Sequence, residues 1–378
     1  MNTEYLLLVL FLVFLFSLVF SVLTNVILLR FARTLGVRDQ KELQSVRWSS
    51  TVKPSLGGIT FFISFLVSIS IYAIFFNGND VLKTAGAAGM LLSLSLAFLM
   101  GLADDAYNTK PFLKFGVQLT CAGILIITGH YISITPYEWL NYVLTVLWVV
   151  GIMNSINMLD NMDAITGTVS VTIIISLLVS IRVNNFNSVM DMVVLCGVCG
   201  SLFGFLFHNW HPSVIFMGDT GSQFLGMLLA FFGIKYFWNA PDSFGQVIQG
   251  KQFCSVLMAF VIPLVDTIFV VVSRIARKQS PFIGGKDHTT HYLSYLGLSD
   301  SQVAFLFGGL GLFSSFLVAL ISHYIFSWNN VYTLVFLLYF VLLIVLIFII
   351  KWMLGQHVNK KINTNDYPVC RGIFGVNG

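Results

Sequence analysis

Charged residues are scarce in this chain: Asp, Glu, Lys and Arg together make up 10% of its 378 residues. Soluble domains carry about 25% charged residues, so the composition excludes an ordinary water-soluble enzyme. Hydrophobic residues instead reach 57%, and the mean hydropathy is +0.87. We therefore predict an integral membrane protein whose partner is the lipid bilayer, and we expect no binding to nucleic acid.

Cysteine is also sparse, with five residues in the whole chain. This number does not build the dense disulfide framework of a small secreted domain. Cys196 and Cys199 form a Cys-x-x-Cys pair, but the pair lies in an apolar run without a second Cys or His pair at zinc-binding spacing. We interpret both as packing residues and expect stability to come from helix packing.

Long uncharged apolar runs dominate what remains, and a helix needs about 20 such residues to span the hydrocarbon. About eleven runs of this kind occur, at 5–29, 55–76, 84–103, 115–135, 139–157, 164–181, 192–207, 220–238, 253–273, 301–322 and 330–350. The short alternating segments of a membrane β-barrel are not the pattern here. We predict an all-α polytopic membrane protein of about eleven transmembrane helices. A single transmembrane domain is expected over 1–354, followed by a cytoplasmic tail over 355–378.

Basic residues are distributed unevenly between the loops that join these runs. Sixteen of the 20 Lys and Arg residues fall in one set of alternate loops and in the tail. The other four are Lys83, Arg182, Lys235 and Lys251. Because Lys and Arg are retained on the cytoplasmic side, we predict that the amino terminus is outside and the carboxyl terminus inside.

Acidic residues gather on the same predicted cytoplasmic face. The members of this group are Asp104, Asp105, Asp160, Asp163, Asp219 and Asp287, with Asp266 inside the ninth apolar run. Carboxylates crowded at a membrane face need cations to offset their mutual repulsion. The pattern therefore predicts a metal-dependent site.

Two of the acidic groups stand in recognisable local patterns. Asp104 and Asp105 end the third run and Lys114 precedes the fourth, so a metal ion or the lysine can neutralise the pair; a solvated helix end is the alternative. Farther along, Asn154, Asn157, Asp160 and Asp163 recur at intervals of three. On a helix this spacing places hard oxygen ligands along one side, suited to Mg²⁺ and to sugar hydroxyls, whereas helix capping accounts for only one or two of the four.

Two more polar features accompany later apolar runs: one segment precedes the run 220–238, and one acid lies within the run 253–273. Asn209 leads to a Gly218-Asp219-Thr220-Gly221 turn, where glycines permit close backbone approach and the next helix presents its amide end to an anion. Asp266 lies inside an apolar run, either as a functional acid or as an internal partner of Arg274 or Lys235.

The last polar segment is a basic loop that holds His288 and His291. Arg274 and Arg277 precede this loop, and Lys286 lies within it. Cationic and imidazole groups at a cytoplasmic mouth suit a diphosphate.

Taken in order, these motifs resemble one family. The strings DD…K, NxxNxxDxxD, GDxGS, PxxDT…R and a His-bearing loop are similar to those of the polyprenyl-phosphate N-acetylhexosamine-1-phosphate transferases, the WecA/TagO/MraY superfamily. The resemblance runs from Pro54-Ser-Leu-Gly-Gly58 to Leu293. It implies an enzyme of the bacterial inner membrane with a cytoplasmic active site. Such an enzyme transfers N-acetylhexosamine-1-phosphate from a UDP-sugar to undecaprenyl phosphate and releases UMP, and the product initiates a cell-envelope polysaccharide.

The resemblance also implies roles for individual residues, with Mg²⁺, or Mn²⁺, as the cofactor. Asn157 and Asp219 match the metal ligands, and Asp104 and Asp105 match the acidic pair assigned to the lipid phosphate. The catalytic set is completed by Asp160, Asp163, His288 and His291, and the substrate-binding set by Lys114, Asn154, Asn209, Asp266, Arg274 and Arg277. Which of the two adjacent aspartates acts as the base is left open, as is homodimerisation.

Three departures from the family pattern bear on the donor sugar. Asn161 and Ala164 stand where the family often has glycine, and Lys53 is two positions out of register with a basic residue usual before Pro54. The loop reads Asp-His-Thr-Thr-His rather than the triple-His form of the MurNAc-pentapeptide branch. We therefore predict UDP-GlcNAc as the donor, with FucNAc or QuiNAc as alternatives.

A cation-coupled transporter is the competing class, because its intramembrane acids would bind ions. Such a transporter is expected to show repeated halves and carboxylates near the midplane. The chain has no convincing internal repeat, and nearly all of its acids lie at one interface. This asymmetry favours an enzyme.

Overall fold

The structure, a computed structural model, describes residues 3–34, 53–76, 83–184, 186, 188–241, 245–280, 285–325 and 327–362. Part of the predicted cytoplasmic charge lies outside these ranges, namely Arg38, Lys41 and Arg47 of the first basic loop and Arg371 of the tail. The last helix continues to Ile362, past the predicted domain boundary at residue 354. The boundary itself stays a prediction.

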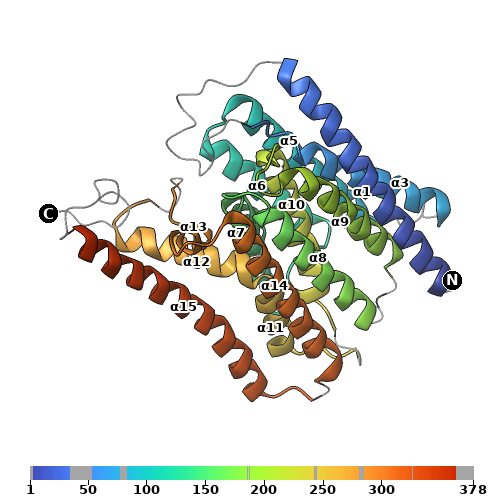
Figure 1. Ribbon diagram of the computed structural model, residues 1–378. Coiled ribbons are helices and arrows are strands. Elements are labelled where there is room, and N and C mark those ends of the chain that lie inside the picture. Colours follow the sequence, from blue (N-terminus) through green and yellow to red (C-terminus); the bar gives the residue numbers. More distant parts are fainter. Residues whose placement is uncertain are drawn as a thin grey trace.

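Helices form the described part of the chain, as predicted (Figure 1). In order they are α1 (Thr3–Thr34), α3 (Gly58–Phe75), α5 (Ala85–Tyr107), α6 (Pro111–Ile127), α7 (Glu138–Leu159), α8 (Ile165–Val183), α9 (Val189–Asn209), α10 (Gly218–Gly233), α11 (Gln249–Ala259), α12 (Val261–Ala276), α13 (Thr289–Tyr295), α14 (Asp300–Ala319) and α15 (Asn330–Ile362). Two π-helical segments, η1 (Ile234–Trp238) and η2 (Leu320–Tyr324), extend α10 and α14.

The polytopic class is confirmed, although the number of spans differs from the predicted eleven. Within the described ranges, eight helices are long and apolar enough to cross a membrane, and α11 with α12 would make a ninth. Each predicted run overlaps a helical segment, with the ninth run divided between α11 and α12, but α6 has only 17 residues and α10 only 16. An apolar run therefore marks a helix more reliably than it marks a full crossing, because a short helix can be covered by its neighbours.

The pair α11 and α12 is one apolar run in the sequence but is bent by 77° at its break. The break falls at Phe260, and Pro263 stands in the first turn of α12. Proline is tolerated in a first turn because the backbone amide it lacks would have no partner there. The bend allows α12 to carry Asp266 and Arg274 away from the direction of α11.

The centre of the bundle is α10, in which every residue except Asp219 is buried. It packs against α5, α7 and α3. Glycines permit close approach to it: a Cβ at Gly58 of α3 would lie 2.1 Å from the Gly221 amide nitrogen, and a Cβ at Gly101 of α5 would lie 2.3 Å from the Asp219 carbonyl oxygen. The segment before α3 adds a short parallel bridge to the segment before α10, with Phe216 N–H donating to the Pro54 carbonyl at 2.9 Å. The start of α10 is therefore held by both backbone and helix contacts.

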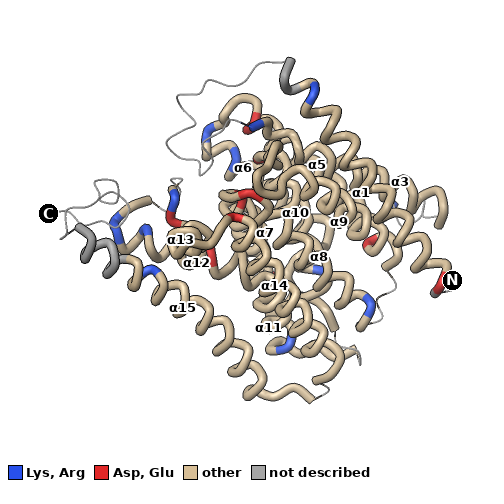
Figure 2. Tube along the Cα trace, viewed as in Figure 1, with Lys and Arg blue, Asp and Glu red and all other residues tan. Residues whose placement is uncertain are grey.

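The described charged residues lie mainly toward the ends of the helices (Figure 2). The start of α1 and the end of α15 lie on opposite sides of the bundle, as an N-out, C-in arrangement requires (Figure 1). Acidic residues from α5 and α10 converge near the start of α6, whereas Asp191 lies in the first turn of α9, away from this group. The membrane orientation itself stays a prediction.

Candidate active site

Five of the predicted residues meet in what we call the acidic centre: Asp104, Asp105, Lys114, Asn157 and Asp219. The Lys114 ammonium lies 3.0 Å from an oxygen of Asp104 and 3.0 Å from Oδ1 of Asp219. The Asn157 amide contacts the same Asp219 oxygen and donates to the Ser222 hydroxyl at 2.8 Å. Residues from α5, α6, α7 and α10 therefore converge on one point.

The two adjacent aspartates have different surroundings. Asp105 accepts from the backbone N–H of Asp219 at 3.0 Å and from the backbone N–H and hydroxyl of Thr220 at 2.8 and 2.7 Å. Asp104 instead accepts from the Thr109 N–H at 3.0 Å and contacts Lys114. The sequence predicts that the amide end of α10 binds an anionic ligand. In the structure, the Asp105 carboxylate occupies this end of the helix.

Gly218 explains how Asp105 comes so close to α10. Its φ of +72° is the left-handed conformation that glycine adopts readily. A Cβ at this position would lie 2.4 Å from an oxygen of Asp105. The glycine before Asp219 is therefore needed for this contact between α5 and α10.

The acidic centre has the donor set of a hard divalent cation. It contains three carboxylates and one carboxamide against a single ammonium, so its negative charge is not balanced by its own cation. Carboxylate and carboxamide oxygens are the ligands that Mg²⁺ prefers. The residues present therefore fit a metal ion; Asn157 and Asp219 both lie in the acidic centre, and their role as its ligands stays a prediction.

The Asn-Asp motif does not form one continuous helical stripe, which corrects the sequence interpretation. Helix α7 ends at Leu159, so only Asn154 and Asn157 lie on it. Asn154 exchanges hydrogen bonds with Gln118 of α6, at 2.9 and 3.3 Å, instead of facing the acidic centre's carboxylates. Asp160 caps the end of α7. Asp160 and Asp163 both lie in the α7–α8 connection, after the helix has ended, so they do not continue the line of Asn154 and Asn157.

The second site, which we call the loop clamp, comprises Lys53, Asp163, His211, Ser213 and Asp300. Asp163 accepts from the Ser213 N–H and hydroxyl at 3.1 and 2.7 Å, and Lys53 lies 3.4 Å away. Burial opposes ionisation, but these hydrogen bonds and the Lys53 charge hold the pKa of Asp163 below its usual range. The clamp joins the segment before α3 to the α7–α8 and α9–α10 connections.

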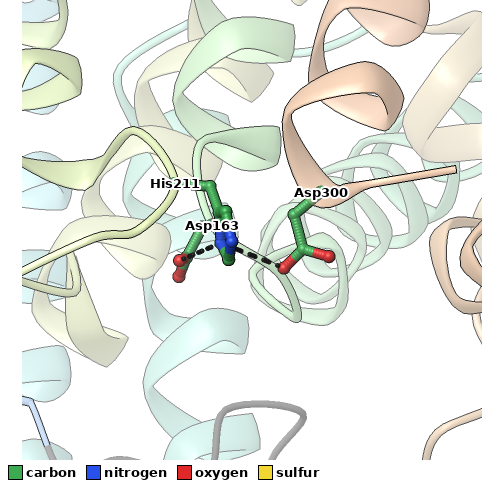
Figure 3. Close-up of side chains that lie close together, drawn as sticks. All are labelled: Asp163, His211 and Asp300. Atoms are coloured by element: carbon green, nitrogen blue, oxygen red, sulfur yellow. Dashed lines mark hydrogen bonds and ion pairs between the residues drawn. The ribbon is translucent and has the colours of Figure 1, made fainter.

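Within this clamp, His211 lies between Asp163 and Asp300, the first residue of α14, as Figure 3 shows. Its Nδ1 lies 3.1 Å from Asp163 and 3.5 Å from Asp300. The three side chains could geometrically hold a metal ion, since their ligand atoms lie within 4.8 Å of one another. However, Asp163 already accepts from Lys53 and Ser213, which uses most of its roughly four lone-pair positions. We therefore place the candidate metal at the acidic centre.

Asn209 is a structural connector next to this clamp. Its amide donates to the Ile215 carbonyl at 2.7 Å, and its oxygen accepts from the Ala164 N–H at 2.9 Å. Ala164 has a φ of +64°, and it stands where the family often has glycine. The bond from Asn209 helps to hold this unfavourable conformation at the start of α8. Neither predicted aspartate caps α8.

The third group, the histidine-loop cluster, comprises Asp266, Arg274, Arg277, Asp287 and His288. Asp266 is buried and accepts from His288 Nδ1 at 2.9 Å and from the Thr289 N–H and hydroxyl at 2.8 and 2.7 Å. The sequence alternatives of Arg274 or Lys235 as its partner are wrong. Lys235 pairs with Asp191 at the other end of the bundle.

Both arginines of this cluster contact Asp287. Arg274 donates to it through two nitrogens, at 3.1 and 2.7 Å, and Arg277 contacts one of its oxygens. Burial alone would raise the pKa of Asp287, but the two guanidinium groups outweigh burial and lower the pKa to about 2. The carboxylate is therefore ionised at neutral pH, and it orients both arginines.

His291 differs from His288 in its surroundings. It is 1% exposed, and its Nδ1 accepts from the His288 N–H at 3.3 Å. Burial, together with His288, lowers the pKa of His291 to about 3. His291 is therefore neutral at physiological pH and supplies no positive charge to a phosphate. This differs from the sequence prediction of a cationic loop that suits a diphosphate.

Several residues of these groups were missed from the sequence. The sequence marks Lys53 only as a register mismatch, and Asp287 only as one more cytoplasmic acid. Thr220, which binds Asp105, and Ser213, which binds Asp163, carry no signal of their own because hydroxyl residues are common in loops. The described cysteines are all free, in agreement with a packing role for Cys196 and Cys199.

Comparison with known proteins adds an independent line of evidence. Residues 87–237 match the family described as glycosyl transferase family 4. This range contains the acidic centre and most of the loop clamp.

Individual relatives cover more of the chain. The chain is 30% identical over 296 residues to the probable undecaprenyl-phosphate N-acetylglucosaminyl 1-phosphate transferase of Bacillus subtilis, covering 76% of this chain and 77% of that protein. It is 26% identical to the decaprenyl-phosphate N-acetylglucosaminephosphotransferase of Mycobacterium leprae, covering 68% and 70%. It is also 28% identical to the phospho-N-acetylmuramoyl-pentapeptide-transferase of Kosmotoga olearia, covering 71% and 83%.

Proposed function

Because this chain belongs to glycosyl transferase family 4, within the MraY/WecA superfamily, we propose that it transfers N-acetylhexosamine-1-phosphate from a UDP-sugar to undecaprenyl phosphate. UMP is the second product. The observation that carries the proposal is the acidic centre, where four helices bring three carboxylates, one lysine and one carboxamide together. The family assignment also weighs against the transporter alternative.

In the proposed reaction, an oxygen of the lipid phosphate forms a bond to the phosphorus that carries the sugar. The bond from that phosphorus to the bridging oxygen of the diphosphate breaks, and UMP leaves with the electron pair. Both reactants are anionic, so positioning and charge compensation supply most of the catalysis. Lys114 supplies one positive charge at the acidic centre.

The metal ion in this proposal is Mg²⁺, or Mn²⁺, held by Asn157 and Asp219. When bound, it would neutralise the diphosphate and polarise the phosphorus that is attacked. This assignment is supported by the excess of carboxylates over ammonium groups in the acidic centre.

The adjacent aspartates divide their labour in our proposal. Asp104 contacts Lys114 and stands as the group that can accept a proton from a monoprotonated lipid phosphate, whose second pKa is about 6. Asp105 is committed to three donors of α10, so it acts as a positioning residue that orients Asp219. The contacts therefore favour Asp104 as the base.

The remaining predicted residues fall around the acidic centre or support it. We propose that the loop clamp and Asp160 contact the nucleotide-sugar, and that Arg274, Arg277 and His288 face its phosphates or that of the lipid. Asp266 positions His288 through their 2.9 Å contact. Asn154 and Asn209 hold helices and loops together.

We propose GlcNAc as the sugar, with FucNAc and QuiNAc as alternatives. Two of the relatives above are named for N-acetylglucosamine, and the loop has two histidines in place of three in succession. The pentapeptide transferase is nearly as similar by identity, at 28%, so overall similarity does not separate the donors. The chemistry of the histidine loop therefore carries this choice.

A donor screen with purified protein in lipid nanodiscs tests the proposal. UDP-GlcNAc labelled on the phosphate next to the sugar is incubated with undecaprenyl phosphate and Mg²⁺, with Asp219→Ala as the inactive control. We expect the label in the lipid and UMP in solution. Release of UDP would mean that the sugar moved without its phosphate. Turnover with UDP-MurNAc-pentapeptide alone would overturn the donor assignment.

The protein is a multi-pass membrane protein of a bacterial family, and we propose that it lies in the inner membrane with its acidic centre on the cytoplasmic face. Cysteines introduced beside Asp104, Asp160, Asp219 and His288 should be protected from a membrane-impermeant reagent in intact cells. External labelling at one of them would contradict a shared cytoplasmic site.

A further inference from the structure

A cavity of about 190 Å³ lies at the end of the bundle opposite to the acidic centre. It is formed where α5 and α9 begin and where α6 and α10 end, so the helices that carry the acidic centre also build this cavity. Eighteen residues of α5 separate Gly86, in the cavity wall, from Asp104, a separation of about 27 Å at 1.5 Å per residue. The cavity is therefore distinct from the proposed active site.

Asp191 supplies the most unusual group in this cavity. Its side chain is 1% exposed, and its Oδ2 accepts from the Lys235 ammonium at 2.5 Å and from the Tyr236 hydroxyl. Its Oδ1 is buried and has no hydrogen-bond partner in the described part of the chain. A buried acceptor without a donor costs about 1–3 kcal/mol, so Oδ1 has a strong need for a donor from a ligand.

His130 supplies a second acceptor in the cavity wall. Its Nδ1 lies 3.2 Å from the Thr128 carbonyl oxygen, which assigns the ring hydrogen to Nδ1 and leaves Nε2 as an acceptor. Burial lowers the pKa of His130, so the ring is neutral at physiological pH. The ring stacks on Phe231, with centroids 5.2 Å apart, and this holds its orientation.

These groups define the charge of a suitable ligand. Asp191 and Lys235 compensate each other, and His130 is neutral, so the cavity has no net charge to balance that of an ion. Enclosing an uncompensated charge would cost desolvation energy. The two acceptors require hydroxyl or N–H donors, while the remaining N–H groups of Lys235 require an acceptor. A hydroxyl group satisfies both needs, because it donates and accepts.

We propose that this cavity binds a small neutral polyol or monosaccharide. Its hydroxyls donate to Asp191 Oδ1 and His130 Nε2 and accept from Lys235, while Phe231 contacts its carbon atoms. A cavity of about 150 Å³ already holds a benzene ring, so the volume of about 190 Å³ accommodates a polyol of the size of glycerol, and a monosaccharide would fill it. With the predicted topology, such a ligand reaches the site from outside the cell, where Lys235 is partly exposed.

Saturation-transfer NMR on the full chain in lipid nanodiscs tests this proposal, with D-glucose and glycerol as probes. We expect saturable contacts for both probes at millimolar concentration. His130→Phe keeps the ring but removes both nitrogens. Gly86→Ala places a Cβ 2.2 Å from His130 Cε1 and so displaces that ring. Each should weaken glucose binding at least tenfold.

Gly123→Ala is the matched control, because a Cβ there meets nothing within 4 Å. It should bind glucose as the wild type does. All three variants should retain sugar-phosphate transfer, which shows that they fold and separates this site from the proposed active site. The proposal is overturned if neither probe gives saturable contacts, or if the two cavity variants bind glucose normally. It is also overturned if ethanolamine binds in place of glucose and Asp191→Asn abolishes that binding, since the cavity would then select a cation.

Discussion

The acidic centre and the histidine-loop cluster both combine aspartates with cationic side chains, but the charges balance differently in the two groups. In the acidic centre, Asp104 and Asp219 share one ammonium, that of Lys114, while Asp105 accepts from donors of α10. In the histidine-loop cluster, Asp287 is held by two arginines and Asp266 by His288 and Thr289. The first group therefore has charge left to bind a cation, whereas the second has satisfied its own carboxylates.

This difference shows why carboxylate content alone does not locate a metal site. A carboxylate surrounded by arginines or N–H donors is already stabilised and gains little from a metal ion. A carboxylate that shares its only cation with another carboxylate gains a great deal. The charge balance around each acid, rather than the number of acids, thus distinguishes a binding group from a structural one.

The largest expected effect comes from removing a proposed metal ligand. Asp219→Ala should lower transfer at least 10²-fold and abolish the response to Mg²⁺, because the diphosphate charge is left uncompensated. Radiolabelled transfer at a series of Mg²⁺ concentrations measures both effects. Glu138→Gln, at an exposed carboxylate at the start of α7, is the control and should behave as the wild type. Near-normal activity of Asp219→Ala would place the metal elsewhere.

The second test sharpens the contrast between the adjacent aspartates. Asp105→Ala leaves three α10 donors without their acceptor and should destabilise the start of that helix by about 1–3 kcal/mol. Activity should fall about tenfold or more, with an unchanged pH profile. Asp104→Asn should instead lose the acidic limb of the profile with little change in thermal stability. If Asp105→Ala altered the pH profile and Asp104→Asn did not, our division of labour would be reversed.

A third experiment concerns the histidine-loop cluster and its pH dependence. The pKa of Asp287 is lowered to about 2, so its stabilising effect is fully present above the ordinary Asp pKa near 4 and is lost as the pH falls through 2. Asp287→Asn should cost about 3 kcal/mol, because Arg274 is left buried without its partner. Thermal unfolding at pH 7 measures this cost, which should shrink as the pH approaches 2. A loss that is equally large at pH 2 would mean that ionisation of Asp287 contributes nothing.

The smallest expected effect is at Ala164. Its φ of +64° costs an L-residue about 1 kcal/mol, and glycine avoids this cost but loses more conformational entropy on folding. Ala164→Gly should therefore be neutral or stabilising by less than about 1 kcal/mol, with transfer activity retained. Denaturation midpoints of the two proteins provide the comparison. Asn209→Ala, which removes the acceptor for the Ala164 N–H, should be destabilising and serves as the opposite case.

Composition and motif order by themselves determined the class and the family. Apolar runs located the helices that carry Asp104, Asn157, Asp219 and Asp266, because burial in lipid requires an apolar sequence regardless of the fold, but no run marked α13, which carries His291. The motifs predict that Asp104, Lys114, Asn157 and Asp219 share one site, and in the structure these four residues lie together. The roles of these residues stay predictions.

Tertiary structure alone decided which partner each charged group has. Asp266 pairs with His288 rather than Arg274, and Asp105 binds α10 while Asp104 faces Lys114. Neighbours in sequence diverge in this way because successive residues on a helix point about 100° apart, so adjacent carboxylates meet different helices. The sequence also does not predict the Asp191 cavity, because its polar groups come from separate segments of the chain and share no motif.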